Sequence, residues 1–406
     1  MGKNERILAE GIYRNNDTWE TGLNNNDLII GASGAGKTRN YVKPNLLQCN
    51  ESVIVADTKG QLCKEVGPVL KKNGYDVQVV DFTDLGSGIG YNPLDFIRYN
   101  PKTKRFMEQD IMKIATCLVS DKHEREKFWP FSARLYMEVL IGYVLEFLPK
   151  EEHNLKYVLE LFSYMDQNEF DVLFREVEYA YPDSFTAKKY QLIKGNRASE
   201  KTHSSIKAFV SEALNPFAFA EAETMLTKKK RVRFSDLGRK KTVLFVNISD
   251  VDRSMDGIIN LFYTQALQTL CEEADKYGIK IIVDVVANHL RGEGTNVDAN
   301  ISSSNHPDYF RWNNKTSPNV NWKDRNEVTT CNIGMRDLNS ENKELQNIIL
   351  AYINDLKSIG VDGIRWDTAK HISLPSEGCN FWPTVTDEGI YNYGEILRGP
   401  DDSGNS

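Results

Sequence analysis

The sequence predicts an α/β protein in two parts. Up to about residue 275, short apolar strands alternate with segments whose apolar residues recur at helical spacing, which is typical of a parallel sheet covered by helices. Residues 287 to 345 then become rich in Asn and contain no long apolar run, before a helix and a strand pattern return. We therefore expect one domain at 1–275 and a second at 276–406.

Four apolar runs predict the strands of the first domain. They are "DLII" at 27–30, "SVIVAD" at 52–57, "YDVQVVDF" at 75–82 and "TVLFVNIS" at 242–249. Between the third and fourth runs, residues of about 95–225 show helical periodicity and no convincing strand. We expect this stretch to be an all-helical insertion.

The second domain contains one clear helix and one clear strand. In "ENKELQNIILAYINDLKSIG" an apolar stripe faces one side and Gly360 occupies the position of a C-terminal cap. The stripe consists of Leu345, Ile349, Tyr352, Ile353 and Leu356. The strand "VDGIRWD" follows, and its period of two places Gly363, Arg365 and Asp367 on one face.

Composition and charge exclude several classes of protein. No apolar run approaches the roughly 18 residues that span a bilayer, and the start lacks the apolar core of a signal peptide. The six cysteines form no CxxC pair, which indicates free thiols in a reducing, cytoplasmic location. The net charge of −7 gives no general attraction to nucleic acid. The basic run at 228–241 is either a solvated loop or a DNA-facing patch.

A phosphate-binding motif follows the first expected strand. "GASGAGKT" has the pattern G-x-x-x-x-G-K-[ST], in which glycines let backbone N–H groups surround a phosphate. We expect Lys37 to reach the phosphates of ATP and Thr38 to hold Mg²⁺ at the start of the next helix. The expected nucleotide-binding residues of this loop are Gly31, Ser33, Gly34, Gly36, Lys37 and Thr38.

Several further segments strengthen this interpretation. Together with the motif, "SVIVADTKGQL", "GYNPLDFI", "KFWPFSARLYMEVLI" and "KTVLFVNISDVD" resemble the coupling ATPases of type IV secretion and conjugation over residues 5–275. The resemblance implies a RecA-like P-loop sheet with a helical insertion, assembled as a homo-oligomer that delivers DNA or protein cargo to a secretion channel. It also places Asp57 near the nucleotide. From its position alone, Asp57 is either a helix cap or part of a solvated turn.

From residue 278 to about 398 the chain resembles a different family. "GIKIIVDVVANHL", "MRDLNSEN", "GVDGIRWDTAKHI", "NFWPTVTDEG" and "YNYGEIL" occur in the order found in α-amylase-family glycoside hydrolases, which implies a partial (β/α) barrel and an α-1,4-glucan substrate. By this resemblance Asp367 is the nucleophile, Glu395 the acid/base and Arg365 the residue that orients the nucleophile. The resemblance also assigns Asn288 to a structural Ca²⁺ and His289, Lys370 and His371 to substrate binding.

Asp284 belongs to the stretch that resembles α-amylases, at the position where the coupling family would place its acid. The coupling family requires an apolar strand that ends in paired acids at this point, whereas this chain has "IKIIVDVV", with Val285 after the single acid. We interpret the chain as a chimera joined between about 270 and 278. The functional alternatives are a nucleotide-binding remnant of a coupling motor, a retaining glycoside hydrolase and a non-functional composite. The strand at 279–284 either completes the first sheet, with Asp284 near Thr38, or pairs with "VDGIRWD", or does both in a bifurcated sheet.

Overall fold

The computed structural model describes residues 4–22, 25, 27, 29, 34–58, 60–119, 128–249, 251–252, 254–290, 301–313, 315–317, 319–386 and 389–396. The chain forms two compact units, Met1–Tyr263 and Thr264–Ser406, and the division falls within one helix, α12 (Asp256–Asp275). The expected domain boundary at 275/276 coincides with the end of this helix and stays a prediction. Part of the expected strand at 27–30, together with Gly31 and Ser33, lies outside the described residues.

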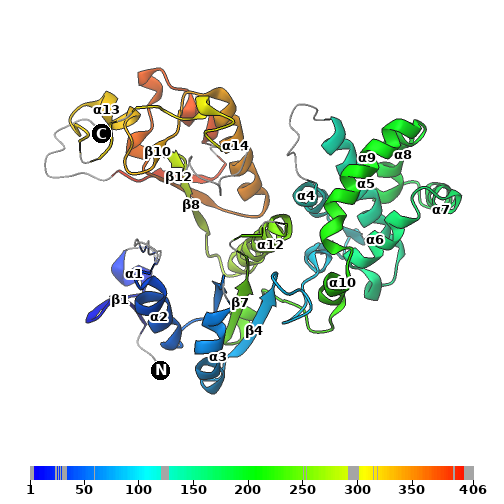
Figure 1. Cartoon of the computed structure of the whole chain (residues 1–406), viewed down its shortest axis with the longest axis horizontal. Coiled ribbons are helices and arrows are strands. Elements are labelled where there is room, and N and C mark those ends of the chain that lie inside the picture. Colours follow the sequence, from blue (N-terminus) through cyan, green and yellow to red (C-terminus); the bar gives the residue numbers. More distant parts are fainter. Residues whose placement is uncertain are drawn as a thin grey trace. The chain divides into compact units, whose positions relative to one another are not determined.

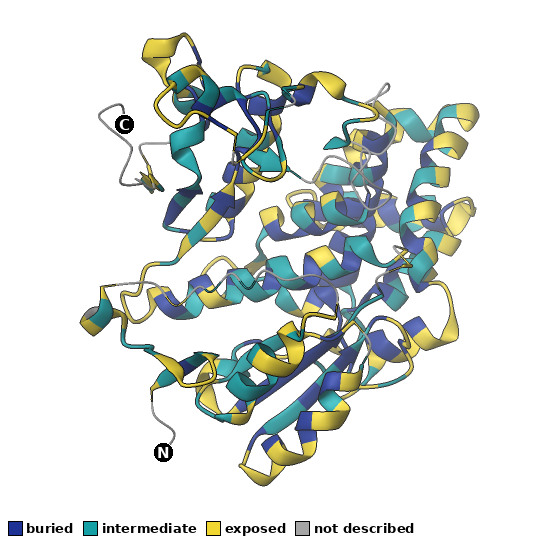
Figure 2. Ribbon diagram, turned by 60° about the vertical axis from the view of Figure 1, so that its left-hand side comes forward, coloured by how far each residue is buried: buried dark blue, intermediate teal, exposed yellow. Residues whose placement is uncertain are grey.

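A three-stranded parallel sheet forms the centre of the first unit (Figure 1). Its order is β3 (Val53–Ala56), β7 (Thr242–Asn247) and β4 (Asp76–Asp81), so β7 lies between two strands that precede it in the chain. Three of the four expected strands are therefore present. The strand β7 is almost completely buried, as its dark blue ribbon in Figure 2 shows, which explains why its sequence is apolar on both faces.

Helices cover this sheet on both faces. On one face, α3 (Gln61–Lys72) packs Leu62, Val66 and Leu70 against Val243 and Phe245. On the other face, aromatic rings join the sheet to α12, since Phe262 contacts both Phe82 and Phe234 edge-on. The short helices α2 (Lys43–Leu47) and α11 (Asp236–Arg239) complete the covering elements.

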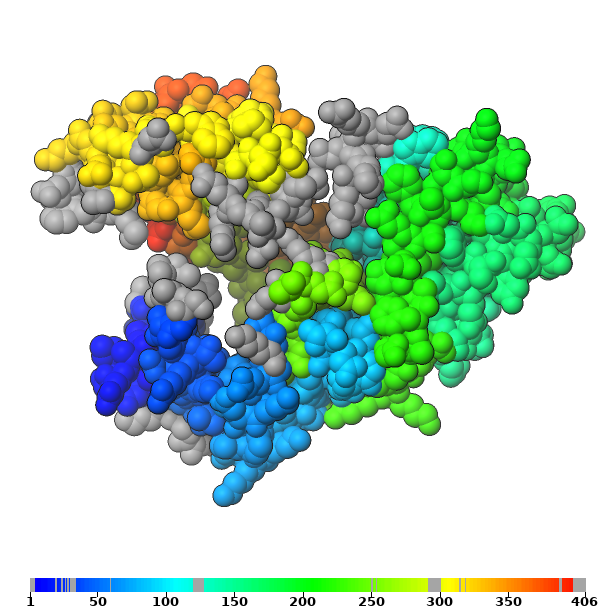
Figure 3. Space-filling model, viewed as in Figure 1, coloured from blue at the N-terminus to red at the C-terminus, as the bar shows by residue number. Residues whose placement is uncertain are grey.

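An antiparallel hairpin precedes the phosphate-binding motif. It consists of β1 (Glu5–Ala9) and β2 (Ile12–Asn15), and the short helix α1 (Thr18–Thr21) follows it. The side chain of Asn45 in α2 donates to the carbonyl oxygen of Ile7 and accepts from its N–H, so that the hairpin is tied to α2. The hairpin and α2 lie side by side, in two shades of blue, in Figure 3.

The region expected to be an all-helical insertion contains one short pair of strands. β5 (Tyr99–Asn100) and β6 (Arg105–Phe106) form an antiparallel pair and are joined by a turn. Its helices are α4 (Glu108–Leu118), α5 (Phe128–Phe147), α6 (Leu155–Ser163), α7 (Asn168–Ala180), α8 (Phe185–Arg197), α9 (Glu200–Leu214) and α10 (Ala220–Thr227).

The central helix α5 is buried although it carries acidic side chains. Glu138 forms an ion pair with Lys189, and Glu146 accepts hydrogen bonds from the backbone N–H groups of Phe185 and Thr186. These partners offset the cost of burying Glu138 and of partly burying Glu146. Among the described residues, no helix is long and apolar enough to cross a membrane.

The second unit contains a three-stranded parallel sheet of its own. Its order is β12 (Tyr391–Gly394), β11 (Gly363–Asp367) and β8 (Ile282–Val286). The structure thus selects among the alternatives for the strand at 279–284. β8 pairs with β11 and, among the described residues, with no strand of the first sheet.

One face of this second sheet is covered by helices. Val285, Ile364 and Trp366 pack with residues of α14 (Lys343–Ser358) and α15 (Phe381–Val385) in a shared core. The remaining elements are the pair β9 (His289–Leu290) and β10 (Arg336–Asp337) and the helix α13 (Arg325–Thr330). Gly360 follows α14 with φ of 99°, as expected of a C-terminal cap.

The apolar stripe of α14 is narrower than its sequence indicates. Leu345, Ile353 and Leu356 are buried, but Tyr352 is 47% exposed. Tyr352 lies at the border of the stripe, where an aromatic ring can contact apolar neighbours while its hydroxyl stays in water.

Candidate functional sites

The phosphate-binding motif lies at the beginning of a helix. Lys37 precedes a π-type helical turn, Thr38–Val42, which continues directly into α2. Gly34 and Gly36 have φ angles of 80° and 87°, a region that disfavours residues with a Cβ atom, so the turn depends on glycine at these positions. Lys37 and Thr38 are both exposed. The N-terminus of the helix therefore presents backbone N–H groups and a cation to the same solvent-accessible space.

The Asp57 side chain caps the first turn of α3 from outside the helix, whose N-cap residue is Gly60. Asp57 follows β3, is 6% exposed and accepts a hydrogen bond of 3.0 Å from the backbone N–H of Cys63 in the first turn of α3. Its own N–H donates to Val246 on the neighbouring strand. Of the two positional alternatives, the cap is the one that these contacts describe. The expected contact between Asp57 and a nucleotide stays a prediction.

Two further polar residues end strands of the same sheet, and the sequence analysis missed them. Asn247 at the end of β7 donates to Asp81 at the end of β4 over 2.6 Å. The other carboxylate oxygen of Asp81 accepts hydrogen bonds from the backbone N–H and the hydroxyl group of Thr83. Burial alone would raise the pKa of Asp81, but these hydrogen bonds lower it below its usual value. With Thr58 and Lys64, these residues surround a cavity of about 550 Å³. The sequence does indicate this location, because a polar residue stands at the C-terminal end of each apolar run that forms a strand of this sheet.

The basic run at 228–241 is largely engaged in contacts within the first unit. Lys228 donates to three backbone carbonyl groups, Arg231 binds Asp95, and Lys240 binds Asp76 and Asp236. The interpretation as a structural loop therefore agrees better with these contacts than a patch of free cations does.

In the second unit, three carboxylates surround one guanidinium group. Arg365 lies directly opposite Asp284 in the β8–β11 register and binds its carboxylate. The same Nη1 atom lies 3.0 Å from Asp367, and Nη2 lies 2.7 Å from Glu395. Burial alone would lower the pKa of Arg365, but the hydrogen bonds to Asp284 and Asp367 raise it above its usual value. The structure thus brings together the three residues expected to be catalytic, with Asp284 as a fourth member.

The backbone next to this cluster is strained. Thr368 follows Asp367 with φ of 51°, and its N–H donates to the second carboxylate oxygen of Glu395 over 3.2 Å. A β-branched residue in the left-handed region is costly, and such strain concentrates at functional sites. This hydrogen bond holds the Glu395 carboxylate beside the backbone that directly follows Asp367.

The expected substrate-binding residues differ in their surroundings. The Nδ1 atom of His289 is buried without a hydrogen-bond partner among the described residues, and burial lowers the pKa of His289 while the nearby charge of Asp367 opposes this. His371 is held by the carbonyl oxygen of Val328, 2.9 Å away, and its pKa is also lowered by burial. The backbone N–H of Lys370 donates to the backbone carbonyl oxygen of Glu395 over 3.4 Å.

Asn288 contacts a buried acid that the sequence analysis did not single out. Its Nδ2 atom donates to Asp337 over 2.7 Å, and the two residues are 2% and 1% exposed. Burial raises the pKa of Asp337 to about 8, although Arg311 and Asn288 oppose the shift. Arg311 remains 3.7 Å away, so it compensates the carboxylate only in part. Among the described residues, no group of three or more His, Cys, Asp or Glu side chains could hold a metal ion.

Comparison with known proteins assigns the two parts to different families. The family described as "Type IV secretory system Conjugative DNA transfer" matches residues 1–283, more than half of the chain. The chain belongs to this conjugative DNA transfer family. A second family, the catalytic domain of α-amylase, matches residues 258–392. The chain therefore joins a conjugative-transfer region to a fragment of an α-amylase catalytic domain, and the two matches overlap in α12 and β8.

One curated relative and two solved structures are similar to parts of this chain. An α-amylase of Clostridium acetobutylicum is 33% identical over 148 residues, which make up 32% of this chain and 19% of the relative. An α-amylase structure from Malbranchea cinnamomea has a TM-score of 0.27 at 29% identity and covers 34% of this chain and 29% of that one. The plasmid coupling protein TrwB in complex with ADP and Mg²⁺ has a TM-score of 0.41 at 17% identity, with 63% and 54% covered. This conjugative-transfer chain thus spans about a fifth of the length of its curated amylase relative.

Proposed function

We propose that the conjugative-transfer region binds ATP with Mg²⁺ and that it is the remnant of a RecA-like coupling motor. The proposal rests on the N-terminus of the helix after Gly36, where Lys37 and Thr38 are exposed beside two glycines at positive φ. A helix N-terminus of this kind favours a phosphate, because its first N–H groups point out of the helix and its dipole is positive. Lys37 would neutralise the phosphates and the Thr38 hydroxyl would hold Mg²⁺.

Rapid hydrolysis of ATP is not part of the proposal. A coupling motor requires a carboxylate beside its Mg²⁺, and the acid that the sequence offers, Asp284, is bound by Arg365 in the other sheet. The following residue is Val285, an apolar side chain that is buried in a hydrophobic core. No second acid therefore stands at this position. The expected outcome is nucleotide binding without appreciable turnover.

The test is the affinity of the full-length chain for a fluorescent ATP analogue, measured with and without Mg²⁺. Saturable binding that Mg²⁺ strengthens would support the proposal. If the nucleotide does not bind at millimolar concentration, the proposed nucleotide-binding function is wrong.

Retaining hydrolysis of α-1,4-glucans is the second candidate function. The cluster of Asp367, Glu395 and Arg365 favours it, because retaining enzymes use two neighbouring carboxyl groups as nucleophile and acid/base. However, the sheet that carries the cluster has only three strands among the described residues, whereas a closed parallel barrel has eight. We expect binding of glucan at most, with His289, Lys370 and His371 as the contacts implied by resemblance.

Ca²⁺ in the amylase fragment is a further proposal. Asn288 and the buried Asp337 supply the oxygen atoms that a hard cation prefers, and the nearest guanidinium nitrogen to Asp337 is 3.7 Å away. If they hold Ca²⁺, adding the ion should raise the melting temperature of the wild-type chain and not that of Asp337→Ala. An equal response of both proteins would contradict this assignment.

The partners and the location of the chain are proposals on family grounds. Membership of the conjugative-transfer family implies DNA or protein cargo, secretion-channel components and assembly with other copies of the chain. We propose a cytoplasmic location. Co-purification of the full chain with channel components from cells that carry a conjugative plasmid would test the partner assignment.

A further inference from the structure

Among the described residues, β3 is an edge strand of the first sheet. This strand pairs with β7 in parallel, with Val53 opposite Val243 and Ala56 opposite Val246, and no other strand pairs with it among the described residues. The backbone N–H of Asp57 donates to the carbonyl oxygen of Val246 in β7. Because backbone groups alternate in direction along a strand, those of Val53 and Val55 also point toward β7. The backbone groups of Ile54 and Ala56 consequently point to the opposite side, where a further strand would lie.

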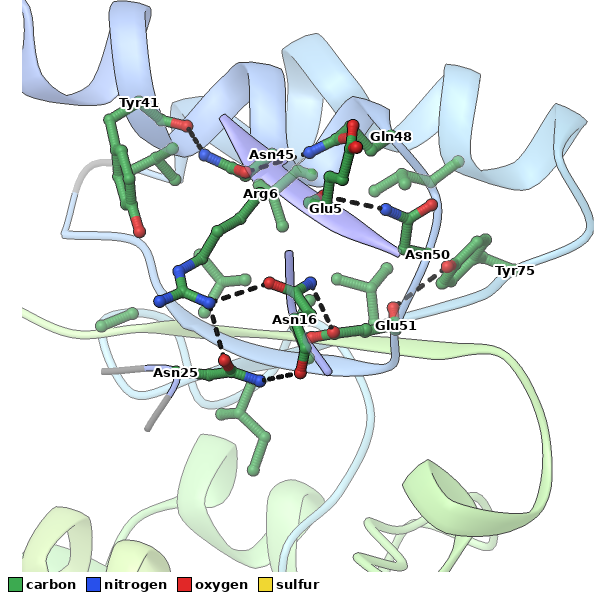
Figure 4. A pocket seen from close by; sticks show the side chains of 18 residues that line it. Glu5, Arg6, Asn16, Asn25, Tyr41, Asn45, Gln48, Asn50, Glu51 and Tyr75 are labelled. Carbon is green, nitrogen blue, oxygen red and sulfur yellow. Dashed lines mark hydrogen bonds between the residues drawn. The ribbon is translucent and has the colours of Figure 1, made fainter. Parts of the chain in front are cut away.

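A cavity of about 440 Å³ runs along this edge. All four residues of β3 line it, together with apolar side chains of α2, α3 and the turn before α2. Figure 4 shows the opposite wall, which is built from the β1–β2 hairpin and from polar side chains around it. We call this cavity the β3 groove. The apolar lining residues from outside β3 are Val42, Leu46, Leu70 and Val243.

The polar side chains of the opposite wall bind mainly one another. Arg6 donates to Asn16, Asn25 and Asp27, and Asn16 donates to Glu51. Asn45 makes its hydrogen bonds with the backbone of Ile7 and Tyr41 and accepts one from Gln48 (Figure 4). These groups are therefore largely committed to the protein. The outward backbone groups of β3 are the polar groups of the groove for which the described residues supply no partner.

We propose that the β3 groove accepts an extended peptide strand in trans, parallel to β3, with apolar side chains and a basic residue near its N-terminal end. An unpaired strand edge binds such a segment through main-chain hydrogen bonds. The apolar lining selects apolar side chains. The basic residue is inferred from Glu5 and Glu51, which lie at the end of the groove where β3 begins and which would face it (Figure 4).

The chain itself contains a segment with this chemistry, which supplies a probe. "GIKIIVDVV" at 278–286 carries Lys280 near its start and apolar residues after it, but in the intact protein it forms β8 and is paired with β11. A labelled synthetic peptide of this sequence can be added to the full-length chain. Binding would be measured by fluorescence anisotropy, in the absence of nucleotide, so that the result does not depend on the proposed ATP site.

Two matched comparisons test the mode of binding. A peptide that is N-methylated at consecutive backbone amides has lost N–H groups on both of its edges, and its affinity should fall at least about tenfold, the loss of one or two hydrogen bonds. Glu51→Lys should weaken the unmodified peptide and strengthen a peptide with Lys replaced by Glu at its third position. Circular dichroism of Glu51→Lys checks that the variant is folded.

Three results would overturn the proposal. They are no binding of the peptide, equal binding of the N-methylated peptide, and an unchanged preference in Glu51→Lys. Self-association of the chain that competes with the peptide would assign the open edge to a second copy instead of a peptide partner.

Discussion

Arg365 and Asp284 face each other on neighbouring parallel strands, and the guanidinium group of Arg365 binds the Asp284 carboxylate. This pair assigns Asp284 to the amylase fragment, although the sequence before it belongs to the conjugative-transfer match. The same guanidinium also binds Asp367 and Glu395. One cation thus holds three acids that would otherwise repel one another at the end of the sheet.

Replacing Arg365 should destabilise the second unit. In Arg365→Met the three carboxylates lose their shared cation, and we expect the free energy of unfolding to fall by about 1–2 kcal/mol, because the cluster is only partly buried. Asp284→Asn keeps a hydrogen-bond acceptor and removes one negative charge, so it should cost less. Urea unfolding followed by tryptophan fluorescence would show the difference, and equal losses would contradict the shared role of Arg365.

Lys37→Ala should abolish the binding of ATP with Mg²⁺. The substitution removes the cation at the N-terminus of the helix and leaves the glycine turn intact. Lys43→Ala is the matched control, because it removes one positive charge from the next helical turn, where Lys43 binds Glu65. Titration with a fluorescent ATP analogue should show binding in the control only. Equal affinity in both variants would rule out the proposed site.

Asp57→Ala should destabilise the first unit by about 1 kcal/mol, the usual cost of losing a cap. Asp57→Asn should lose less, since its side-chain oxygen can still accept from Cys63. Thermal unfolding measures both changes. If Asp57 also contacts the bound nucleotide or its Mg²⁺, then the Asn variant should bind ATP more weakly while it remains folded, and unchanged affinity would leave Asp57 with a capping role alone.

Release of sugar from α-1,4-glucan should stay at background in the purified chain. Asp367 and Glu395 are bound to the same guanidinium, but their three-stranded sheet does not enclose a substrate in the way that a complete barrel does. Reducing-sugar assays on soluble starch would compare the wild type with Asp367→Asn. Activity above background that disappears in the variant would show that the fragment is a functional hydrolase.

The helical insertion should lose stability as the pH falls below 7. His203 accepts a hydrogen bond from Tyr136 and contacts Asp166, and burial together with Arg197 lowers the pKa of His203. A lowered pKa means that the unfolded chain, with a histidine pKa of about 6.5, takes up the proton first. The stability is therefore present above pH 6.5 and decreases as the pH falls toward the folded pKa.

His203→Gln tests this pH dependence, because glutamine does not titrate. The free energy of unfolding of the wild type, measured by urea titration, should decrease between pH 7 and pH 5 by more than that of the variant. Parallel pH profiles for the two proteins would exclude His203 as the source.

The helices and strands with strong periodicity were predictable from local sequence. The strands β3, β4 and β7 lie within the expected runs, and the helix α14 lies within 341–360. The cluster of Arg365, Asp367 and Glu395 was predictable because strand-end positions and motif order both indicated it. Asp337 was not, because its burial against Asn288 depends on the pairing of two-residue strands that carry no periodic signal.

The sequence by itself determined the local features and the double ancestry of this protein. The glycines of the phosphate-binding turn, the cap after α14 and the order of motifs in each part depend on residues close together in the chain. Only the tertiary structure decided where the strand at 279–284 pairs, because its apolar side chains suit a central strand in either sheet. The backbone of this strand could form the same hydrogen bonds in either sheet. Its pairing partner is therefore decided by side chains, namely the packing of Val285 with Trp366 and the contact between Asp284 and Arg365.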